Sequence, residues 1–336
     1  MPDYTFNSAA ILGAGSLGTS LARLLSQRLD SIILVGNEPE VVEGINKQHK
    51  NPKYLIDIEL GEKVTATGDH AKIIGQPLII FAVPTVAIRS EAEKLKALEL
   101  PVTTPLLTCA KGIERNTGER MSEILRDVFA ENPIGILTGP NHAEEISKDM
   151  VTCAVVASEC SELAKALQEL FTLPHFRTYT TTDIAGVELG GAVKNVYAIA
   201  AGMAHGLGLG DNASAALVTR ALAEMTRLGV AMGGQPETFA GLSGVGDLIV
   251  TCFSEHSRNH RVGLAMGKGK TLQEAVDSLG MCAEGVPNTL SIYEAARKLG
   301  VRTPIIDAVY AVLYEDMPTG KAMKALLERD PRPETE

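Results

Sequence analysis

The chain has 336 residues, a formal net charge of -10 at pH 7, 45% hydrophobic residues and only 4% aromatic residues. Its length favours two domains, each large enough for its own core. The negative charge argues against general binding to nucleic acid or to an anionic membrane surface. The five cysteines form no C-x-x-C pair, which favours reduced thiols. With no signal-peptide layout and no long apolar run, we expect a soluble, cytoplasmic protein.

The first half of the chain alternates short apolar runs with amphipathic stretches. This alternation predicts βαβ units in a parallel, doubly wound α/β sheet. Two further apolar runs, residues 152–157 and 176–180, extend the sheet and close the domain near Asp183. The other predicted strands are residues 9–12, 31–35, 77–83, 105–110 and 133–137, and the predicted helices between them are 17–28, 86–98 and 119–130.

After Asp183 the strand signals stop. Residues 186–204 are an Ala/Gly-rich stretch of helical length, and residues 212–232 repeat apolar side chains on one helix face. Thr271 and Thr303 provide start signals for two more helices, the second of which is the last long one. These patterns predict an all-α second domain. The predicted domains are residues 1–183 and 184–328, followed by a disordered polar tail at 329–336.

Gly13, Gly15 and Gly18 fit the spacing G-x-G-x-x-G between the first predicted strand and the first predicted helix. The three glycines suit a tight turn, a close approach of pyrophosphate and a helix packed on a strand, in that order. Free N–H groups at the helix start would hold the phosphates. A plain glycine turn is the alternative in a chain with 32 glycines. The early position inside a βαβ unit favours a Rossmann-type dinucleotide site.

The residues after the second predicted strand leave the type of nicotinamide cofactor open. An acidic residue at the strand end favours NAD, and an arginine nearby favours NADP. Asn37 is neither acid nor base, and Glu38 follows one position late. The sequence therefore predicts NAD or NADP without choosing between them.

A lysine within an apolar helix is the main catalytic candidate. From residue 189 to residue 204 the only polar side chains are those of Lys194, Asn195 and Tyr197. Desolvation lowers the pKa of a lysine, which can then exchange protons near neutrality and protonate the alkoxide that hydride transfer leaves. The alternative is a lysine whose stem packs on the core while its ammonium reaches water.

Other polar residues suit a substrate site. Lys111 follows a predicted strand, at the edge where open α/β sheets bind ligands. Residues 257–259, Ser-Arg-Asn, offer donors suited to phosphate. Asp247 either caps a helix or holds a lysine and a substrate hydroxyl. Surface roles are the alternative for Lys111 and for residues 257–259. The histidines show no metal-ligand spacing, so no metal is predicted.

Several of these segments, in the same order across both domains, resemble the bacterial NAD(P)-dependent glycerol-3-phosphate dehydrogenases. The match runs from Gly13 to about Tyr314. It implies reversible conversion of dihydroxyacetone phosphate and sn-glycerol 3-phosphate, which supplies glycerophospholipid synthesis. We also expect a homodimer that takes a small phosphorylated substrate. The segments that carry the resemblance are residues 109–112, 139–140, 186–195, 244–248 and 257–259.

The resemblance also implies roles for single residues. Lys194 matches the family's proton acceptor for alcohol oxidation, and Lys111 and Asp247 are expected to be catalytic residues that also hold the substrate. Arg258 is expected nearest the substrate phosphate, and Asn195 and Thr251 resemble supporting donors. The further substrate positions are Gly139, Asn141, Ser257 and Asn259. The nucleotide positions, besides the three glycines, are Ser16, Leu17, Asn37, Lys111, Ala143, Arg258, Cys282 and Glu284.

The chain departs from the family pattern in two places. Asn37 stands where the family often has His or Arg, which removes a cation from the adenine side. Asn141, His142 and Glu145 stand where the family usually has Ser or Thr, Phe and Lys. Asn141 can still form hydrogen bonds, whereas the loss of a lysine at position 145 weakens the local positive field.

Two other functions remain open at this point. A related two-domain 3-hydroxyacid or 6-phosphogluconate dehydrogenase also uses a lysine on a helix, so the fold alone does not separate these enzymes. A non-enzymatic dinucleotide-binding regulator predicts cofactor binding without turnover. That regulator gives no reason for Lys111, Lys194 and Arg258 to converge.

Overall fold

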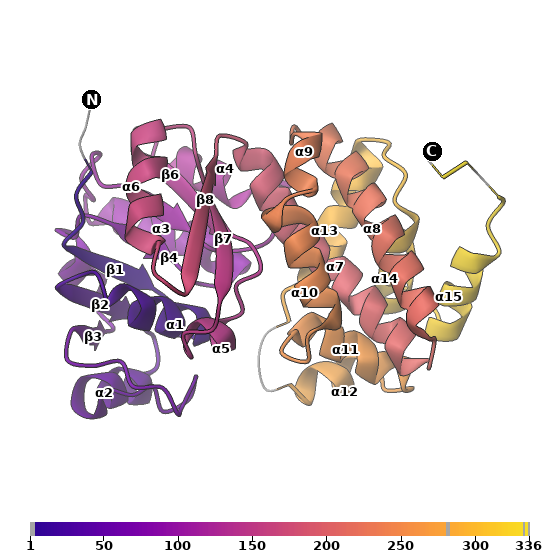
Figure 1. The fold of residues 1–336 in the computed structure, drawn as a ribbon, viewed down its shortest axis with the longest axis horizontal. Coiled ribbons are helices and arrows are strands. Elements are labelled where there is room, and N and C mark those ends of the chain that lie inside the picture. The colour runs from indigo at the N-terminus through magenta and orange to yellow at the C-terminus, as the bar shows by residue number, and fades with distance from the viewer. Residues whose placement is uncertain (1–3, 280–282, 332, 335–336) are drawn as a thin grey trace.

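The computed structural model describes residues 4–279, 283–331 and 333–334. Two lobes lie side by side, a sheet with helices on its faces and a bundle of helices (Figure 1). The sheet ends at Thr181 and the first helix of the bundle begins at Ile184, so the change of architecture falls at Asp183. Among the described residues, no helix combines the length and apolar content that crossing a bilayer requires.

The first lobe is built on an eight-stranded sheet of order β3-β2-β1-β4-β5-β6-β7-β8. Each predicted strand has a counterpart in it. One strand, β3, was not predicted, because its four residues, Val-Thr-Ala-Thr, are too few to give a clear pattern. The strands are β1 (Ser8–Leu12), β2 (Ser31–Val35), β3 (Val64–Thr67), β4 (Ile79–Phe81), β5 (Leu106–Thr108), β6 (Ile134–Thr138), β7 (Thr152–Ser158) and β8 (Phe176–Thr181).

The expectation of a parallel sheet is correct for every pair except β6 and β7, which run antiparallel with Thr138 opposite Val155. A parallel neighbour requires a crossover to the other end of the sheet. Here the connection 139–151 leaves β6 and enters β7 at the same edge. It therefore stays above the carboxyl ends of the parallel strands, where α/β sheets bind ligands.

Helices cover both faces of the sheet and bury an apolar layer on each. Leu21 of α1 and Ile45 of α2 belong to one layer, and Ile88 of α3 and Ile124 of α4 belong to the other. The predicted helices are present, whereas the largely polar α2, the short α5 and the amphipathic α6 were not predicted. The helices are α1 (Ser16–Leu25), α2 (Pro39–Gln48), α3 (Ile88–Ala97), α4 (Met121–Val128), α5 (Ala143–Ile146) and α6 (Ser161–Phe171), with short 3-10 turns η1 (His70–Ile73) and η2 (Thr85–Ala87).

The second lobe is helical and surrounds one central helix, α7 (Ile184–Gly206), which is buried from Gly186 to Ala204. Its Ala/Gly-rich sequence suits this position because small side chains let neighbours approach closely. The remaining elements are α8 (Asp211–Ala231), α9 (Pro236–Phe239), the π-helical turn η3 (Leu242–Gly246), α10 (Asp247–Phe253), α11 (Arg258–Gly267), α12 (Leu272–Asp277), α13 (Gly285–Lys298), α14 (Pro304–Tyr314) and α15 (Thr319–Leu327).

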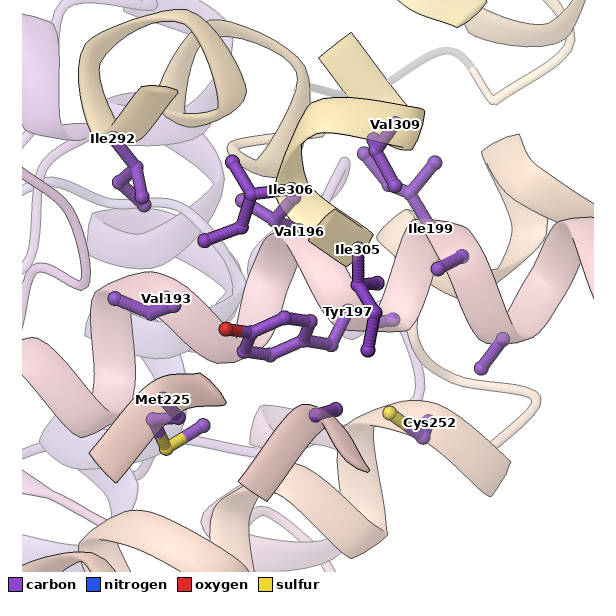
Figure 2. Close-up of a cluster of buried hydrophobic side chains, with 14 of the residues drawn as sticks. Val193, Val196, Tyr197, Ile199, Met225, Cys252, Ile292, Ile305, Ile306 and Val309 are labelled. Carbon is purple, nitrogen blue, oxygen red and sulfur yellow. The ribbon is translucent and has the colours of Figure 1, made fainter. Parts of the chain in front are cut away.

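Close packing around α7 leaves no room for added side-chain atoms. A Cβ at Gly202 would lie 2.0 Å from the carbonyl oxygen of His260 on α11. On the side of α7 that faces α14, Val196 and Tyr197 lie in one apolar cluster with Ile305 and Ile306 (Figure 2). A side chain in the middle of α7 is therefore held by dense packing.

The end of the chain differs from the expectation. Helix α15 follows α14, which was predicted to be the last long helix. Of the tail predicted to be disordered, residues 332, 335 and 336 lie outside the described residues. The other residues of 329–336 form neither helix nor strand.

Asp183 offers a test of what stabilises the start of the helical lobe. Its carboxylate is buried and accepts hydrogen bonds from the N–H groups of Gly186 and Gln235 and from the Thr238 hydroxyl. Asp183→Ala should lower the free energy of unfolding by about 3 kcal/mol, because a cap and buried charged hydrogen bonds are lost together. The matched control is Thr271→Ala at the exposed cap of α12, expected to cost about 1 kcal/mol. Equal effects in urea denaturation would contradict this prediction.

Candidate active site

A cavity of about 460 Å³ lies between the two lobes. One end of its lining is the glycine loop between β1 and α1, and the other contains Lys194 of α7 and Arg258 of α11. Lys111 and Asn141, which follow β5 and β6, also line it. The cavity thus brings together the carboxyl ends of the strands and the buried central helix.

The glycine loop has the shape that a dinucleotide phosphate requires. Gly13 has φ +105°, and a Cβ there would lie 2.6 Å from the carbonyl oxygen of Ala82. At Gly18 a Cβ would meet the carbonyl oxygen of Gly13 at 1.8 Å, whereas Gly15 faces open space. The start of α1 has no side-chain cap, so its N–H groups are available to an anion. These residues fit a dinucleotide cofactor.

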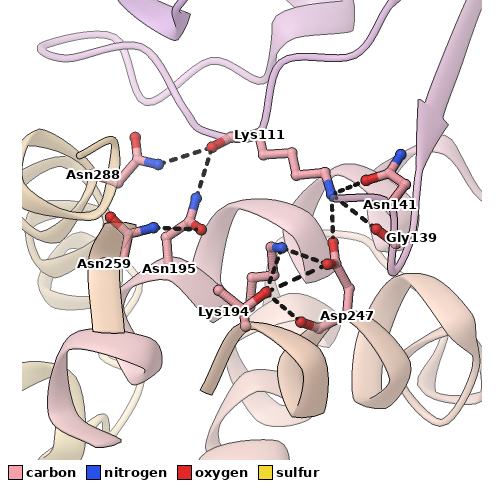
Figure 3. A network of polar contacts seen from close by, with 9 residues as sticks. Lys111, Gly139, Asn141, Lys194, Asn195, Asp247, Asn259 and Asn288 are labelled. Carbon is pink, nitrogen blue, oxygen red and sulfur yellow. Dashed lines mark hydrogen bonds and ion pairs between the residues drawn. The ribbon is translucent and has the colours of Figure 1, made fainter. Parts of the chain in front are cut away.

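Lys194 lies with its ammonium in the cleft rather than in bulk solvent. Its side chain is 5% exposed. The Nζ atom donates to Oδ1 of Asp247 at 2.5 Å (Figure 3). It also donates to Oγ1 of Thr251 at 2.7 Å. The Thr251 hydroxyl donates to the Asp247 carbonyl oxygen, so it accepts from the lysine. Among the described residues, these two acceptors leave one of the three ammonium protons free for a ligand.

Asp247 binds both lysines instead of capping α10. Its carboxylate is 1% exposed and also accepts from Nζ of Lys111 at 2.8 Å. Gly246 is the N-cap of α10, and no side-chain cap bond is present there. The preceding π-helical turn leads into Asp247 as the first residue of α10, and such turns recur at functional sites.

Burial sets the protonation of this cluster. It lowers the pKa of Lys194 to about 7; Asp247 opposes this shift and the nearby charge of Lys111 adds to it. Burial alone would raise the pKa of Asp247, but the two ammonium groups hold it below its ordinary value. The lysine therefore exchanges its proton near neutral pH while the aspartate stays ionised.

Lys111 is held by three acceptors. Besides Asp247, its Nζ donates to the Gly139 carbonyl oxygen at 2.9 Å and to Oδ1 of Asn141 at 2.7 Å (Figure 3). All three ammonium protons are thus in use. Because Lys111 and Asn141 belong to the sheet lobe and Asp247 to the helical lobe, this ammonium also joins the two lobes.

Side-chain amides attach the backbone of Lys111 to the helical lobe. Its carbonyl oxygen accepts from Nδ2 of Asn288 at 2.9 Å and from Nδ2 of Asn195 at 3.2 Å. Nδ2 of Asn259 donates to Oδ1 of Asn195 at 2.9 Å, and Oδ1 of Asn259 accepts from the Gly285 N–H. Sequence reasoning missed Asn288, because a single asparagine in a helix gives no signal of such a contact.

A cation at the start of α11 stands apart from this network. Ser257 caps the helix by accepting from the His260 N–H at 3.2 Å. The next residue, Arg258, is exposed and has no hydrogen bond or ion pair with any other described residue. A free guanidinium beside the N-terminus of a ten-residue helix attracts phosphate.

The structure gathers most of the predicted site residues. Gly18, Gly139 and Asp247 do not line the cavity but hold residues that do, and Cys282 lies outside the described residues. The predicted residues that line it are Gly13, Gly15, Ser16, Leu17, Asn37, Lys111, Asn141, Ala143, Lys194, Asn195, Thr251, Ser257, Arg258, Asn259 and Glu284.

Two sets of contacts at the cavity wall were not found from the sequence. Glu284 accepts from the N–H of Thr85 at 3.2 Å and from its hydroxyl at 2.6 Å, which links the lobes at the cavity wall. His142 and His256 line the cavity with ring centroids 6.3 Å apart. Burial, followed by the charges of the nearby lysines, lowers the pKa of His142 to about 4, so its ring is neutral. No cluster of three or more metal-binding side chains occurs in the described part of the chain.

Known proteins match this chain along nearly its whole length. The NAD-dependent glycerol-3-phosphate dehydrogenase N-terminus matches residues 8–164, and the C-terminus of that family matches residues 183–324. A glycerol-3-phosphate dehydrogenase (NAD(P)+) from Clostridium perfringens is 44% identical over 329 residues, which are 98% of this chain and 99% of the relative. That from Moorella thermoacetica is 46% identical over 323 residues, or 96% of each. The crystal structure of the Coxiella burnetii glycerol-3-phosphate dehydrogenase has a TM-score of 0.93 at 36% identity, covering 96% of this chain and 99% of that one.

The protonation of Lys194 can be followed directly. In isotope-edited NMR of lysine side chains, with Lys194→Met to identify the resonance, Lys194 should titrate near pH 7. Lys111→Met should raise its pKa because a like charge is removed, and Asp247→Asn should lower it because the opposite charge is lost. Lys47→Met, at an exposed position on α2, is the control and should have no effect on this titration. A titration at the pKa of a solvated lysine, near 10.4, would show that Lys194 is not buried.

Proposed function

This chain belongs to the NAD-dependent glycerol-3-phosphate dehydrogenase family, and we propose that Lys194 exchanges the proton in its reaction. The chain is an oxidoreductase that interconverts dihydroxyacetone phosphate and sn-glycerol 3-phosphate with NAD(H) or NADP(H), a reaction that supplies glycerophospholipid synthesis. The observation that carries the role of Lys194 is its buried ammonium in the cavity, bound to Asp247 and Thr251 with one proton free. The glycine loop would hold the pyrophosphate of the cofactor.

Lys194 acts on the oxygen at C2 of the substrate. The nicotinamide, when bound, supplies or removes the hydride at that carbon. As the carbonyl carbon is reduced, negative charge grows on its oxygen, and the free proton of the Lys194 ammonium is placed to neutralise it. In the reverse direction neutral Lys194 accepts the alcohol proton. A pKa of about 7 lets one group serve both directions near neutral pH.

Asp247 and Lys111 set the properties of this lysine. Asp247 and Thr251 orient the Lys194 ammonium. The negative charge of Asp247 raises the pKa of Lys194 and so offsets part of the lowering that burial causes. Lys111 counteracts that charge, so the pKa of Lys194 does not return to an ordinary lysine value. We assign Lys111 and Asp247 to tuning and positioning, and Lys111 with Asn141 also forms the polar wall of the substrate site.

Arg258 is the group we assign to the substrate phosphate. Lys111 and Lys194 already bind Asp247, so neither ammonium is free to pair with a doubly charged phosphate. Arg258 has no such partner among the described residues and lies at the N-terminus of α11, with Ser257 beside it. This arrangement favours a phosphorylated ketone over the substrates of the related hydroxyacid dehydrogenases.

A homodimer and a cytoplasmic location complete the proposal. Ile249 and Phe253 project from α10 and are 48% and 54% exposed, an apolar area that a second copy would cover. The described cysteines Cys109, Cys153, Cys160 and Cys252 are all free, as is usual in a reducing compartment. Analytical ultracentrifugation measures the oligomeric state, and a monomer at all concentrations would contradict the homodimer.

The reaction can be tested with a panel of carbonyl substrates. Dihydroxyacetone phosphate should drive oxidation of a reduced nicotinamide without added metal, faster than hydroxyacid precursors or unphosphorylated dihydroxyacetone. Lys194→Met preserves the volume of the side chain and should lower kcat at least about a hundredfold, the usual contribution of a positioned proton donor. Lys47→Met, at an exposed position on α2, is the matched control and should leave kcat unchanged. A kcat for Lys194→Met close to wild type would rule out its role.

The phosphate assignment predicts a selective effect. Arg258→Ala should raise the KM for dihydroxyacetone phosphate by roughly tenfold or more, because a charged hydrogen bond to the phosphate is lost. The KM for unphosphorylated dihydroxyacetone should not change. Arg261→Ala, at an exposed position one turn further along α11, is the matched control. If Arg258→Ala leaves the KM for the phosphorylated ketone unchanged, the phosphate binds elsewhere.

A further inference from the structure

A carboxylate is held in the cavity wall just beyond β2. Glu38 is the N-cap of α2 and lines the cavity together with Asn37 and Tyr54. Its two oxygens accept from Nζ of Lys53 at 2.8 Å and from the Tyr54 hydroxyl at 3.1 Å. Both donors belong to the segment after α2, so the Glu38 side chain is held by residues from a different part of the chain.

This carboxylate adjoins the loop that would hold the cofactor phosphates. The Gly13 N–H donates to the Val35 carbonyl oxygen at 2.9 Å, and a Cβ at Gly36 would lie 2.9 Å from Cβ of Ala14. In a Rossmann-type site the adenosine ribose rests on the end of the second strand. Glu38 comes one position later in sequence than the usual acidic residue, but its contacts with Lys53 and Tyr54 keep it at the cavity surface.

The charges at this end of the cavity do not suit an additional phosphate. The hydrogen bond from Lys53 is the main cause that lowers the pKa of Glu38, so this carboxylate is ionised at neutral pH. Lys53, the cation beside it, is already paired with Glu38 and is not among the described residues that line the cavity. Asn37 adds no charge.

We propose that Glu38 makes this chain select NAD(H) over NADP(H). The inference rests on the proposed function, because it concerns the cofactor of that reaction. The carboxylate can accept hydrogen bonds from the ribose hydroxyls of NAD(H). A 2′-phosphate would instead place additional negative charge beside it, with Lys53 already engaged. The neutral Asn37 does not by itself discriminate between NAD(H) and NADP(H), and we assign that discrimination to Glu38.

Binding measurements separate this inference from catalysis. Dissociation constants are measured by calorimetry for NADH and NADPH, and for the fragments AMP and adenosine 2′,5′-bisphosphate, at one ionic strength without substrate. Wild type should bind NADH at least roughly tenfold more tightly than NADPH. Glu38→Gln should reduce this ratio by about tenfold, mainly through tighter NADPH binding, because it removes the repulsion and releases Lys53. The two fragments should follow the same trend.

The matched control is Glu59→Gln, which alters another exposed carboxylate paired with a lysine, Lys50, away from the described cavity lining. It should leave all four dissociation constants unchanged. Equal or tighter binding of NADPH by wild type would overturn the inference, as would an unchanged ratio in Glu38→Gln or the failure of both cofactors to bind. Selective NADH binding without turnover of dihydroxyacetone phosphate would instead overturn the proposed function and leave this inference standing.

Discussion

The site depends on a buried carboxylate shared by two ammonium groups, that of Asp247 between Lys194 and Lys111. Removing such charges from water costs several kcal/mol each, and only mutual pairing with further hydrogen bonds offsets that cost. Thr251 supplies such a bond to Lys194, and Asn141 with the Gly139 carbonyl supplies them to Lys111. Lys194, Asp247 and Thr251 belong to the helical lobe, whereas Lys111 comes from the sheet lobe. The bond between Lys111 and Asp247 therefore both influences the lysine and joins the lobes.

Two features of the fold bring these groups together. The antiparallel pairing of β6 and β7 keeps the connection 139–151 at the edge of the sheet that faces the helical lobe. Helix α7 is buried along most of its length, which lets it carry a lysine where water is largely excluded. A helix at the surface would leave the same residue solvated, with an ordinary pKa.

The two ends of the cavity use charge in opposite ways. At the chemical end, Lys194 and Lys111 outnumber Asp247, and Arg258 adds a cation that has no partner among the described residues. This positive charge suits an anionic substrate in a chain of net charge -10. At the end beside β2, which we assign to the adenosine of the cofactor, Glu38 contributes a negative charge to the wall. Local placement, and not overall composition, decides which ligand each end accepts.

Local patterns in the sequence determined the elements and their order: the strands from apolar runs, α7 from its small residues, and the phosphate loop from the spacing of Gly13, Gly15 and Gly18. These features depend on neighbours in the chain, so periodicity and turn chemistry suffice to predict them. The strand β3 and the helices α2 and α5 were missed because their patterns are short or polar. The helix α6 was also missed, although its buried apolar side chains follow helical spacing. Local context singled out Lys194, Lys111, Asp247 and residues 257–259, and resemblance to a family supplied the other candidates. Neither source gave the partners of these residues.

Only the tertiary structure decided which alternative held for the polar residues. Asp247 binds two lysines instead of capping a helix, and Lys194 reaches a cleft instead of open water. Asn288 holds the Lys111 carbonyl from a helix far along the chain. Each outcome depends on burial and on contacts between segments distant in sequence, and both arise only through tertiary packing.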